Sequence, residues 1–202
     1  TEETLRDWIW QALKPTQEQW DDWKWHFRNR FNNVDKLARV LPLTETQKKQ
    51  LKLVSVKYPF SITPYYLSLV RANDPNDPIL AQSLPSFEEL VYGDYGEEDP
   101  LHERVDSPVL GVVHRYPDRA LFVITDICPL LCRHCTRKRE WDGDNWWVRR
   151  TPQLEAAIDY LRKTPAIRDV IISGGDPLTV DNDGLEWILS RLRSIPHLEM
   201  IR

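Results

Sequence analysis

Three cysteines, Cys128, Cys132 and Cys135, lie within one short segment and are the only cysteines in the chain. Thiolates are ligands of zinc and of iron–sulfur clusters. Three thiolates are one short of a closed four-ligand site, so a metal or cluster held here would keep a coordination position open for another ligand. The spacing therefore indicates a catalytic centre rather than a structural one.

Two kinds of centre fit these cysteines. A zinc site would need a fourth ligand, for which His114 and His134 are candidates. Zinc sites usually combine two separated pairs of ligands, and this sequence has no second cysteine pair. The Cys-x3-Cys-x2-Cys spacing after an apolar segment therefore favours an iron–sulfur cluster. A zinc-stabilised binding module, with tryptophan-rich helices as its partner surface, is the alternative from a different class.

A glycine-rich turn is the second candidate site. Ser173, Gly174, Gly175 and Asp176 directly follow an apolar segment. Adjacent glycines allow a backbone to approach a ligand closely, although they also suit an ordinary tight turn. An acidic residue beside them could pair with an ammonium group of a ligand.

Basic residues surround the cysteines in the sequence. Guanidinium groups bind carboxylate and phosphate through paired hydrogen bonds. A solvated run of charges is the ordinary alternative. We expect a cationic patch that suits an anionic substrate or a phosphate-bearing cofactor. Its members are Arg115, Arg119, Arg133, Arg137, Lys138 and Arg139.

The first part of the chain, residues 1–113, is predicted to be a helical region that ends in an acidic loop. Capping-box patterns at residues 16–19 and 44–47 predict two helix starts, and Pro64 predicts a third. Trp20, Trp23, Phe27 and Phe31 recur at three- and four-residue steps, which predicts one helix with a single aromatic face.

The second part, residues 114–202, is predicted to be an α/β domain. Strands are expected at 121–125, at 169–172 and from about 198, with helices from Thr151 and over 183–195. Strands that alternate with helices predict a parallel sheet. The cysteine segment and the glycine turn both follow strand ends, where such folds usually carry their chemistry.

Composition limits the possible functions. The net charge of −4 argues against a general nucleic-acid binder. No apolar run is long enough to suggest a membrane span, and no secretory signal opens the sequence. Reduced cysteines at metal-ligand spacing fit a cytoplasmic protein. Because the chain stops within an apolar run after Pro196, we expect a fragment.

Several stretches together resemble the lysine 2,3-aminomutase family of radical S-adenosylmethionine (SAM) enzymes. They are His114–Arg119, Cys128–Arg137, Ser173–Asp176 and Ile195–His197, and the upstream stretches Trp20–Trp25, Ile62–Tyr66, Asp99–Glu103 and Asp106–Pro108 are similar as well. The resemblance covers nearly the whole chain. It implies a radical SAM partial (β/α)6 barrel, of which residues 114–202 would form the N-terminal half.

The resemblance also implies an activity. The family enzyme is an isomerase that moves the α-amino group of L-lysine to the β-carbon, using a 4Fe–4S cluster, SAM and pyridoxal 5′-phosphate (PLP). Glutamate or arginine could replace lysine, because the family's side-chain recognition residues lie beyond residue 202. Formation of β-lysine for modification of a translation factor is a further alternative. The expected partners are a small amino acid, an external electron donor and further copies of the chain.

Residue roles follow from the same resemblance. Cys128, Cys132 and Cys135 would hold the cluster, and Arg137 would bind the substrate carboxylate. The PLP cofactor would lie near Arg115, Tyr116 and Arg119, with Arg119 close to the phosphate. The residues implied near SAM are His134, Ser173, Gly174, Gly175 and Asp176. Residues 140–147 are more aromatic and acidic than is usual in the family, and we expect their tryptophans to pack rather than to contact substrate.

Overall fold

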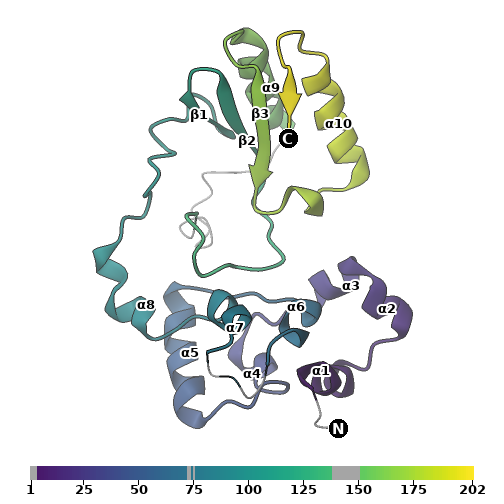
Figure 1. The fold of residues 1–202 in the computed structure, drawn as a ribbon, viewed down its shortest axis with the longest axis vertical. Helices are drawn as coiled ribbons and strands as arrows, with labels where there is room; N and C mark the ends of the chain where they lie inside the picture. Colours follow the sequence, from purple (N-terminus) through teal and green to yellow (C-terminus); the bar gives the residue numbers. More distant parts are fainter. Residues whose placement is uncertain (1–3, 72–73, 75, 138–150) are drawn as a thin grey trace. The chain divides into compact units, whose positions relative to one another are not determined.

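A computed structural model describes residues 4–71, 74, 76–137 and 151–202 of the chain. The chain divides into two compact units, which are described separately here. The helical unit comprises Thr1–Glu98 and Pro129–Asp142, and the sheet unit comprises Asp99–Cys128 and Gly143–Arg202. Figure 1 shows their helices and strands along the chain.

This division differs from the boundary expected between residues 113 and 114. Residues 99–113 belong with the sheet because they hydrogen-bond to its first strands: the His114 amide donates to the Asp106 carbonyl at 2.8 Å, and the Val123 amide to the Gly111 carbonyl at 2.7 Å. The loop that begins at Pro129 belongs with the helices, although it follows a strand in the sequence.

The helical unit consists of short, individually capped helices. Thr16 and Thr44 each form a capping box, as predicted, and Thr63 caps the helix that begins at Pro64. The helices are α1 Leu5–Leu13, α2 Gln17–Asp21, α3 Trp23–Arg28, α4 Val34–Leu37, α5 Glu45–Lys57, α6 Pro64–Ser68, α7 Pro78–Ser83 and α8 Glu88–Val91, followed by the 3-10 turn η1 Gly93–Tyr95.

The prediction of one aromatic-faced helix after Thr16 is wrong. Asp22 interrupts it: its backbone is extended, and its carboxylate accepts hydrogen bonds from the Lys24 and Trp25 amides, which starts α3. The break changes which aromatic residues face the core. Trp23 is exposed, whereas Trp25, outside the predicted stripe, is buried.

The sheet unit is an α/β structure, as predicted. In the part of the chain that the structure describes, its strands are β1 Val112–Tyr116, β2 Arg119–Thr125, β3 Asp169–Gly174 and β4 Met200–Ile201, in that spatial order. The β2–β3 and β3–β4 pairs are parallel, which confirms the predicted parallel sheet. The antiparallel strand β1 was not predicted; it pairs with β2 across the turn at Pro117 and Asp118.

Helices α9, Thr151–Lys163, and α10, Asn182–Arg193, lie beside the sheet in Figure 1. Alternate residues of β2 explain the packing, because successive side chains of a strand point to opposite faces. Ala120, Phe122 and Ile124 are buried in one core with residues of α9 and α10, whereas Val123 packs with Val113 in a separate cluster. No helix among the described residues is long and apolar enough to cross a membrane.

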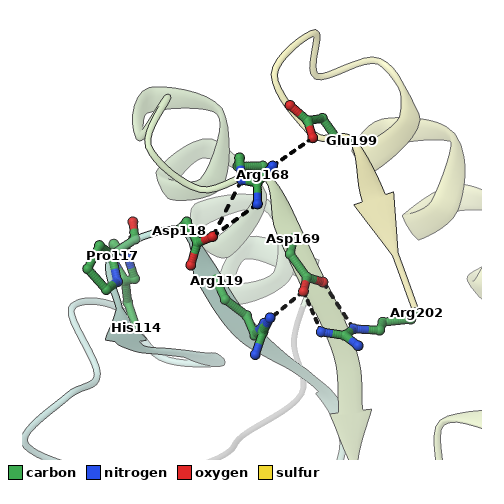
Figure 2. Close-up of polar contacts among 8 residues, drawn as sticks. All are labelled: His114, Pro117, Asp118, Arg119, Arg168, Asp169, Glu199 and Arg202. Atoms are coloured by element: carbon green, nitrogen blue, oxygen red, sulfur yellow. Dashed lines mark hydrogen bonds and ion pairs between the residues drawn. The ribbon is translucent and has the colours of Figure 1, made fainter.

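An ion-pair network joins the starts of β2 and β3 to residues on either side of β4 (Figure 2). The Asp169 carboxylate, at the beginning of β3, accepts a hydrogen bond from Arg119 Nε at 2.7 Å and further hydrogen bonds from Arg202. Beside it, Arg168 bridges the exposed carboxylates of Asp118 and Glu199. The Asp169 side chain is only 10% exposed, so its pairing matters more than that of the outer acids.

We expect Asp169→Asn to destabilise the protein by about 2–4 kcal/mol at neutral pH, because two arginines lose their shared carboxylate. Burial alone would raise the pKa of Asp169, but the hydrogen bonds from Arg202 and Arg119 outweigh it and hold that pKa below 3.8. A depressed pKa contributes stability that is present above the unfolded-state value and is lost as the pH falls through the folded-state value.

Urea unfolding at neutral and acidic pH measures both effects. The wild type should lose stability below about pH 4 through this group, and the variant should lack that component. Asp118→Asn is the matched control, because its ion pair with Arg168 is exposed and should contribute little. Equal stability of the two variants at neutral pH would contradict the role assigned to Asp169.

Candidate functional site

The glycine turn is attached to the chain that leads from β2 into the cysteine segment. The two strands are parallel, so their carboxyl ends lie at the same edge of the sheet. The Gly175 amide donates to the Thr125 carbonyl, and the Asp176 amide to the Ile127 carbonyl, each at 2.7 Å. The sheet thus brings together the two loops that the sequence singled out, up to Cys128.

Close backbone packing explains both glycines. A Cβ atom on Gly174 would lie 2.0 Å from the Thr125 carbonyl oxygen, and one on Gly175 would lie 2.3 Å from that of Ile127. Gly174 also has a φ of 145°, which side chains disfavour. The expectation that the glycines admit a ligand stays a prediction, since their contact with the chain's own backbone already requires them.

Asp176 and Ser173 lie at the same turn and are half-buried. One carboxylate oxygen of Asp176 accepts a hydrogen bond from the Leu178 amide at 3.0 Å, which caps the 3-10 turn η3 Pro177–Thr179. This contact leaves the second carboxylate oxygen for other donors. Pairing of Asp176 with a ligand ammonium group stays a prediction.

The three cysteines are half-buried thiols that come from both units. Cys128 ends a segment of the sheet unit, whereas Cys132 and Cys135 lie in the helical unit. Among the described residues, no group of three His, Cys, Asp or Glu side chains is arranged to hold a metal.

The second and third cysteines lie on one tight turn, in which the Cys135 amide donates to the Cys132 carbonyl at 3.0 Å. The Arg137 amide donates to Cys135 Sγ at 3.4 Å. Burial raises the pKa of the Cys132 thiol, and the nearby Cys135 raises it further. A bound cation would relieve this repulsion between thiolates, and amide hydrogen bonds to sulfur are one of the contacts that tune iron–sulfur clusters. The residues therefore fit a thiolate-held cluster.

Three of the basic residues that the sequence singled out are paired with carboxylates of the chain itself. The Arg115 side chain bonds to Asp106 at 2.8 Å, which raises the pKa of Arg115, and Arg119 is paired with Asp169 at the strand starts. Arg133 is buried against Glu89, so its proposed part in binding an anionic ligand is corrected. Lys138 and Arg139 lie outside the described residues.

The remaining predicted site residues are placed as follows. Tyr116 is exposed at the end of β1, and His134 is exposed between the cysteines. Arg137 is half-buried just after Cys135. His114, considered above as a zinc ligand, contacts the Tyr160 hydroxyl through Nδ1 at 2.7 Å. The tryptophan-rich segment 140–147 lies outside the described residues.

The Arg133–Glu89 pair was missed from the sequence. Glu89 lies in the acidic stretch that was predicted to be loop-like, and nothing in its spacing pairs it with an arginine 44 residues away. An arginine between two cysteines of the motif, where a solvated charge is expected, was the only available signal.

Comparisons with known proteins agree with the cysteine and glycine motifs. Residues 122–201 match the model of the radical SAM superfamily. The chain is 47% identical over 187 residues to L-lysine 2,3-aminomutase of Acetoanaerobium sticklandii, covering 93% of this chain and 45% of that protein. It is 47% identical over 186 residues to L-lysine 2,3-aminomutase of Bacillus subtilis, covering 92% of this chain and 39% of that protein.

A relative with another name is also similar. Glutamate 2,3-aminomutase of Clostridioides difficile is 39% identical over 194 residues, covering 96% of this chain and 46% of that protein. The chain thus spans less than half the length of these curated relatives, and the matched part includes both the cysteine segment and the glycine turn.

Proposed function

The chain belongs to the lysine 2,3-aminomutase family of radical SAM enzymes, and on that basis we propose that the protein is an isomerase that converts L-lysine to β-lysine. One observation of the structure supports this most. The cysteine segment leaves a parallel strand, and its start is hydrogen-bonded to the glycine turn that follows the neighbouring strand.

We assign the cofactors by the family and by the donor chemistry of the residues. Bound together, a 4Fe–4S cluster and SAM would supply a radical able to abstract hydrogen, and PLP would carry the migrating amino group. Cys128, Cys132 and Cys135 would hold the cluster. An external electron donor, a small amino acid substrate and assembly of several copies are part of the same proposal.

The chain's own residues would orient the ligands. The glycine turn and Asp176 would lie against SAM, together with Ser173 and His134. The residues proposed near PLP are Arg115, Tyr116 and Arg119. For Arg119, binding the cofactor phosphate would add to its ion pair with Asp169, because that pair uses Nε and a guanidinium carries further donors.

Anaerobic turnover of the full-length protein tests the proposal. The protein is reconstituted with iron, sulfide, PLP, SAM and reductant, and is offered lysine, glutamate and arginine separately. Formation of β-lysine is the expected result. Cleavage of SAM without any β-amino acid would reject the aminomutase assignment, and zinc in place of iron would favour the binding-module alternative.

Glutamate is the second candidate substrate, because the glutamate 2,3-aminomutase relative matches 96% of this chain. Its lower identity, 39% against 47%, favours lysine. A β-amino product from glutamate alone in the same assay would decide for this second candidate.

We expect Arg137→Lys to weaken substrate use strongly. If the Arg137 guanidinium binds the substrate carboxylate through two hydrogen bonds, lysine at this position replaces them with one point charge, at a cost of about 2–5 kcal/mol. Steady-state kinetics should show a lower kcat/KM, while the iron content stays at the wild-type level. Arg28→Lys, at an exposed arginine, is the control. Unchanged kcat/KM in Arg137→Lys would reject the role.

A further inference from the structure

We propose that Arg133 and Glu89 are positioning residues that hold the cysteine loop on the helical unit and thereby determine how firmly the cluster is retained. This inference rests on the proposed function, in which the cysteines hold a 4Fe–4S cluster. It assigns to residues far apart in the sequence a role that the cysteine motif alone does not contain.

The pair has the geometry of a strong contact. Arg133 Nε donates to Glu89 Oε1 at 2.9 Å, and Arg133 Nη2 donates to Glu89 Oε2 at 2.7 Å. Two parallel hydrogen bonds between a guanidinium and a carboxylate restrict both distance and orientation. The third nitrogen, Nη1, donates to the Pro59 carbonyl at 2.8 Å.

Burial makes the pair obligatory. The side chain of Arg133 is 8% exposed and that of Glu89 is 16% exposed. Removing one partner of a buried ion pair leaves a charge that is neither solvated nor neutralised. Most ion pairs among the described residues involve at least one exposed side chain; Lys52–Asp35 in the same unit is 55% and 77% exposed.

The backbone of the cysteine loop is also hydrogen-bonded to the helical unit. The Arg133 amide donates to the Gln82 carbonyl at 2.8 Å, and the Leu131 amide donates to the Ser61 carbonyl at 3.1 Å. Leu130 packs against the core of the helical unit. The loop backbone is thus hydrogen-bonded to two segments of that unit, at Ser61 and at Gln82, and the Arg133 side chain joins a third through Glu89.

The attachment acts directly on two cluster ligands. Cys132 precedes Arg133, and Cys135 lies one hydrogen-bonded turn further on. Partners that orient metal ligands typically change metal affinity by about 10- to 100-fold when they are removed. Arg133 also places a cation next to the Cys132 thiol, and Glu89 supplies the anion paired with that cation.

Because the two side chains carry opposite charges, the two single variants should have opposite signatures. Glu89→Gln leaves a buried cation near the cluster and should raise its reduction potential, because a positive charge favours the added electron. Arg133→Gln leaves a buried anion and should lower the potential. In both variants a chelator should remove iron about 10-fold faster than from the wild type. The double variant should return to a potential near that of the wild type.

The experiment uses the full-length protein, reconstituted anaerobically with iron and sulfide and assayed for iron content, reduction potential and chelator-driven iron loss. Asp35→Asn is the control, because its ion pair with Lys52 is exposed, and it should match the wild type. If the glutamine variants do not fold, Arg133→Lys decides: it keeps the charge but loses the paired hydrogen bonds, so it should lose iron faster at an unchanged potential.

Failure of the two proposals is distinguishable. A wild-type protein that binds no 4Fe–4S cluster rejects the proposed function. A wild-type protein that holds the cluster, with single variants that retain iron equally well, rejects the positioning role. Faster iron loss in both single variants, with potentials that shift in the same direction, would contradict the opposite electrostatic effects of the two residues and leave the pair only a general stabilising role.

Discussion

Replacing Cys132 with alanine should leave the protein unable to hold an iron–sulfur cluster. Three thiolates are the whole set of cysteine ligands available to the chain, so the loss of one leaves two ligands for a cluster that needs three. After anaerobic reconstitution, we expect iron and sulfide close to background and no visible absorbance of a cluster. We expect this to be the largest functional effect of any single substitution discussed here.

The fold should survive this change. Cys132 is a half-buried thiol rather than half of a disulfide, and alanine keeps the backbone hydrogen bonds of the loop. Circular dichroism and the midpoint of thermal unfolding before reconstitution provide the control. A folded Cys132→Ala protein with the wild-type iron content would contradict the assignment of the cluster to these three cysteines. The proposed radical chemistry would then have no identified electron source.

The largest structural effect should come from Gly174→Ala. The added Cβ would lie 2.0 Å from the Thr125 carbonyl oxygen, far inside van der Waals contact, and the φ of 145° would be strained as well. The obstacle is backbone of the neighbouring strand, which cannot rotate away like the end of a side chain. We expect the variant to lose more than about 4 kcal/mol of unfolding free energy.

Gly96→Ala is the matched control for this experiment. A Cβ there meets no atom within 4 Å, and the change should alter stability by no more than about 0.5 kcal/mol. Chemical unfolding of the two variants beside the wild type makes the comparison. If Gly174→Ala unfolds at the same denaturant concentration as Gly96→Ala, the junction between β2 and β3 is not as tight as the structure describes.

Together, these substitutions separate two properties of one region. Gly174→Ala disturbs the junction in the sheet unit, and the Arg133 and Glu89 variants disturb the attachment in the helical unit. Cys128 lies next to the first in the chain, and Cys132 lies next to the second. Each half of the cysteine motif is thus supported by its own set of contacts. Under the proposed function, a change in either set should weaken retention of the 4Fe–4S cluster.

The sequence by itself determined the features that depend on local periodicity and on residue type. The strands at 121–125 and 169–172, the helix over 183–195 and the capped helix after Thr44 all lie where they were predicted. Alternating strands and helices were enough to predict that β2 and β3 are parallel. The cysteine segment and the glycine turn, together with the other stretches that resemble the family, were enough to suggest it, and relatives of that name are 47% identical over 186 and 187 residues.

Only the tertiary structure decided how distant residues pair. The antiparallel strand β1, the ion pair of Arg119 with Asp169 and that of Arg133 with Glu89 each depend on a register or a packing that no local pattern encodes. At Asp22, a capping hydrogen bond competed with an aromatic periodicity and prevailed, because a carboxylate that satisfies two amides ends one helix and starts another. The sequence alone suggested that Arg133 is solvated. In the fold its side chain is buried and holds the cysteine loop, because the half-buried Glu89 carboxylate lies within hydrogen-bonding distance.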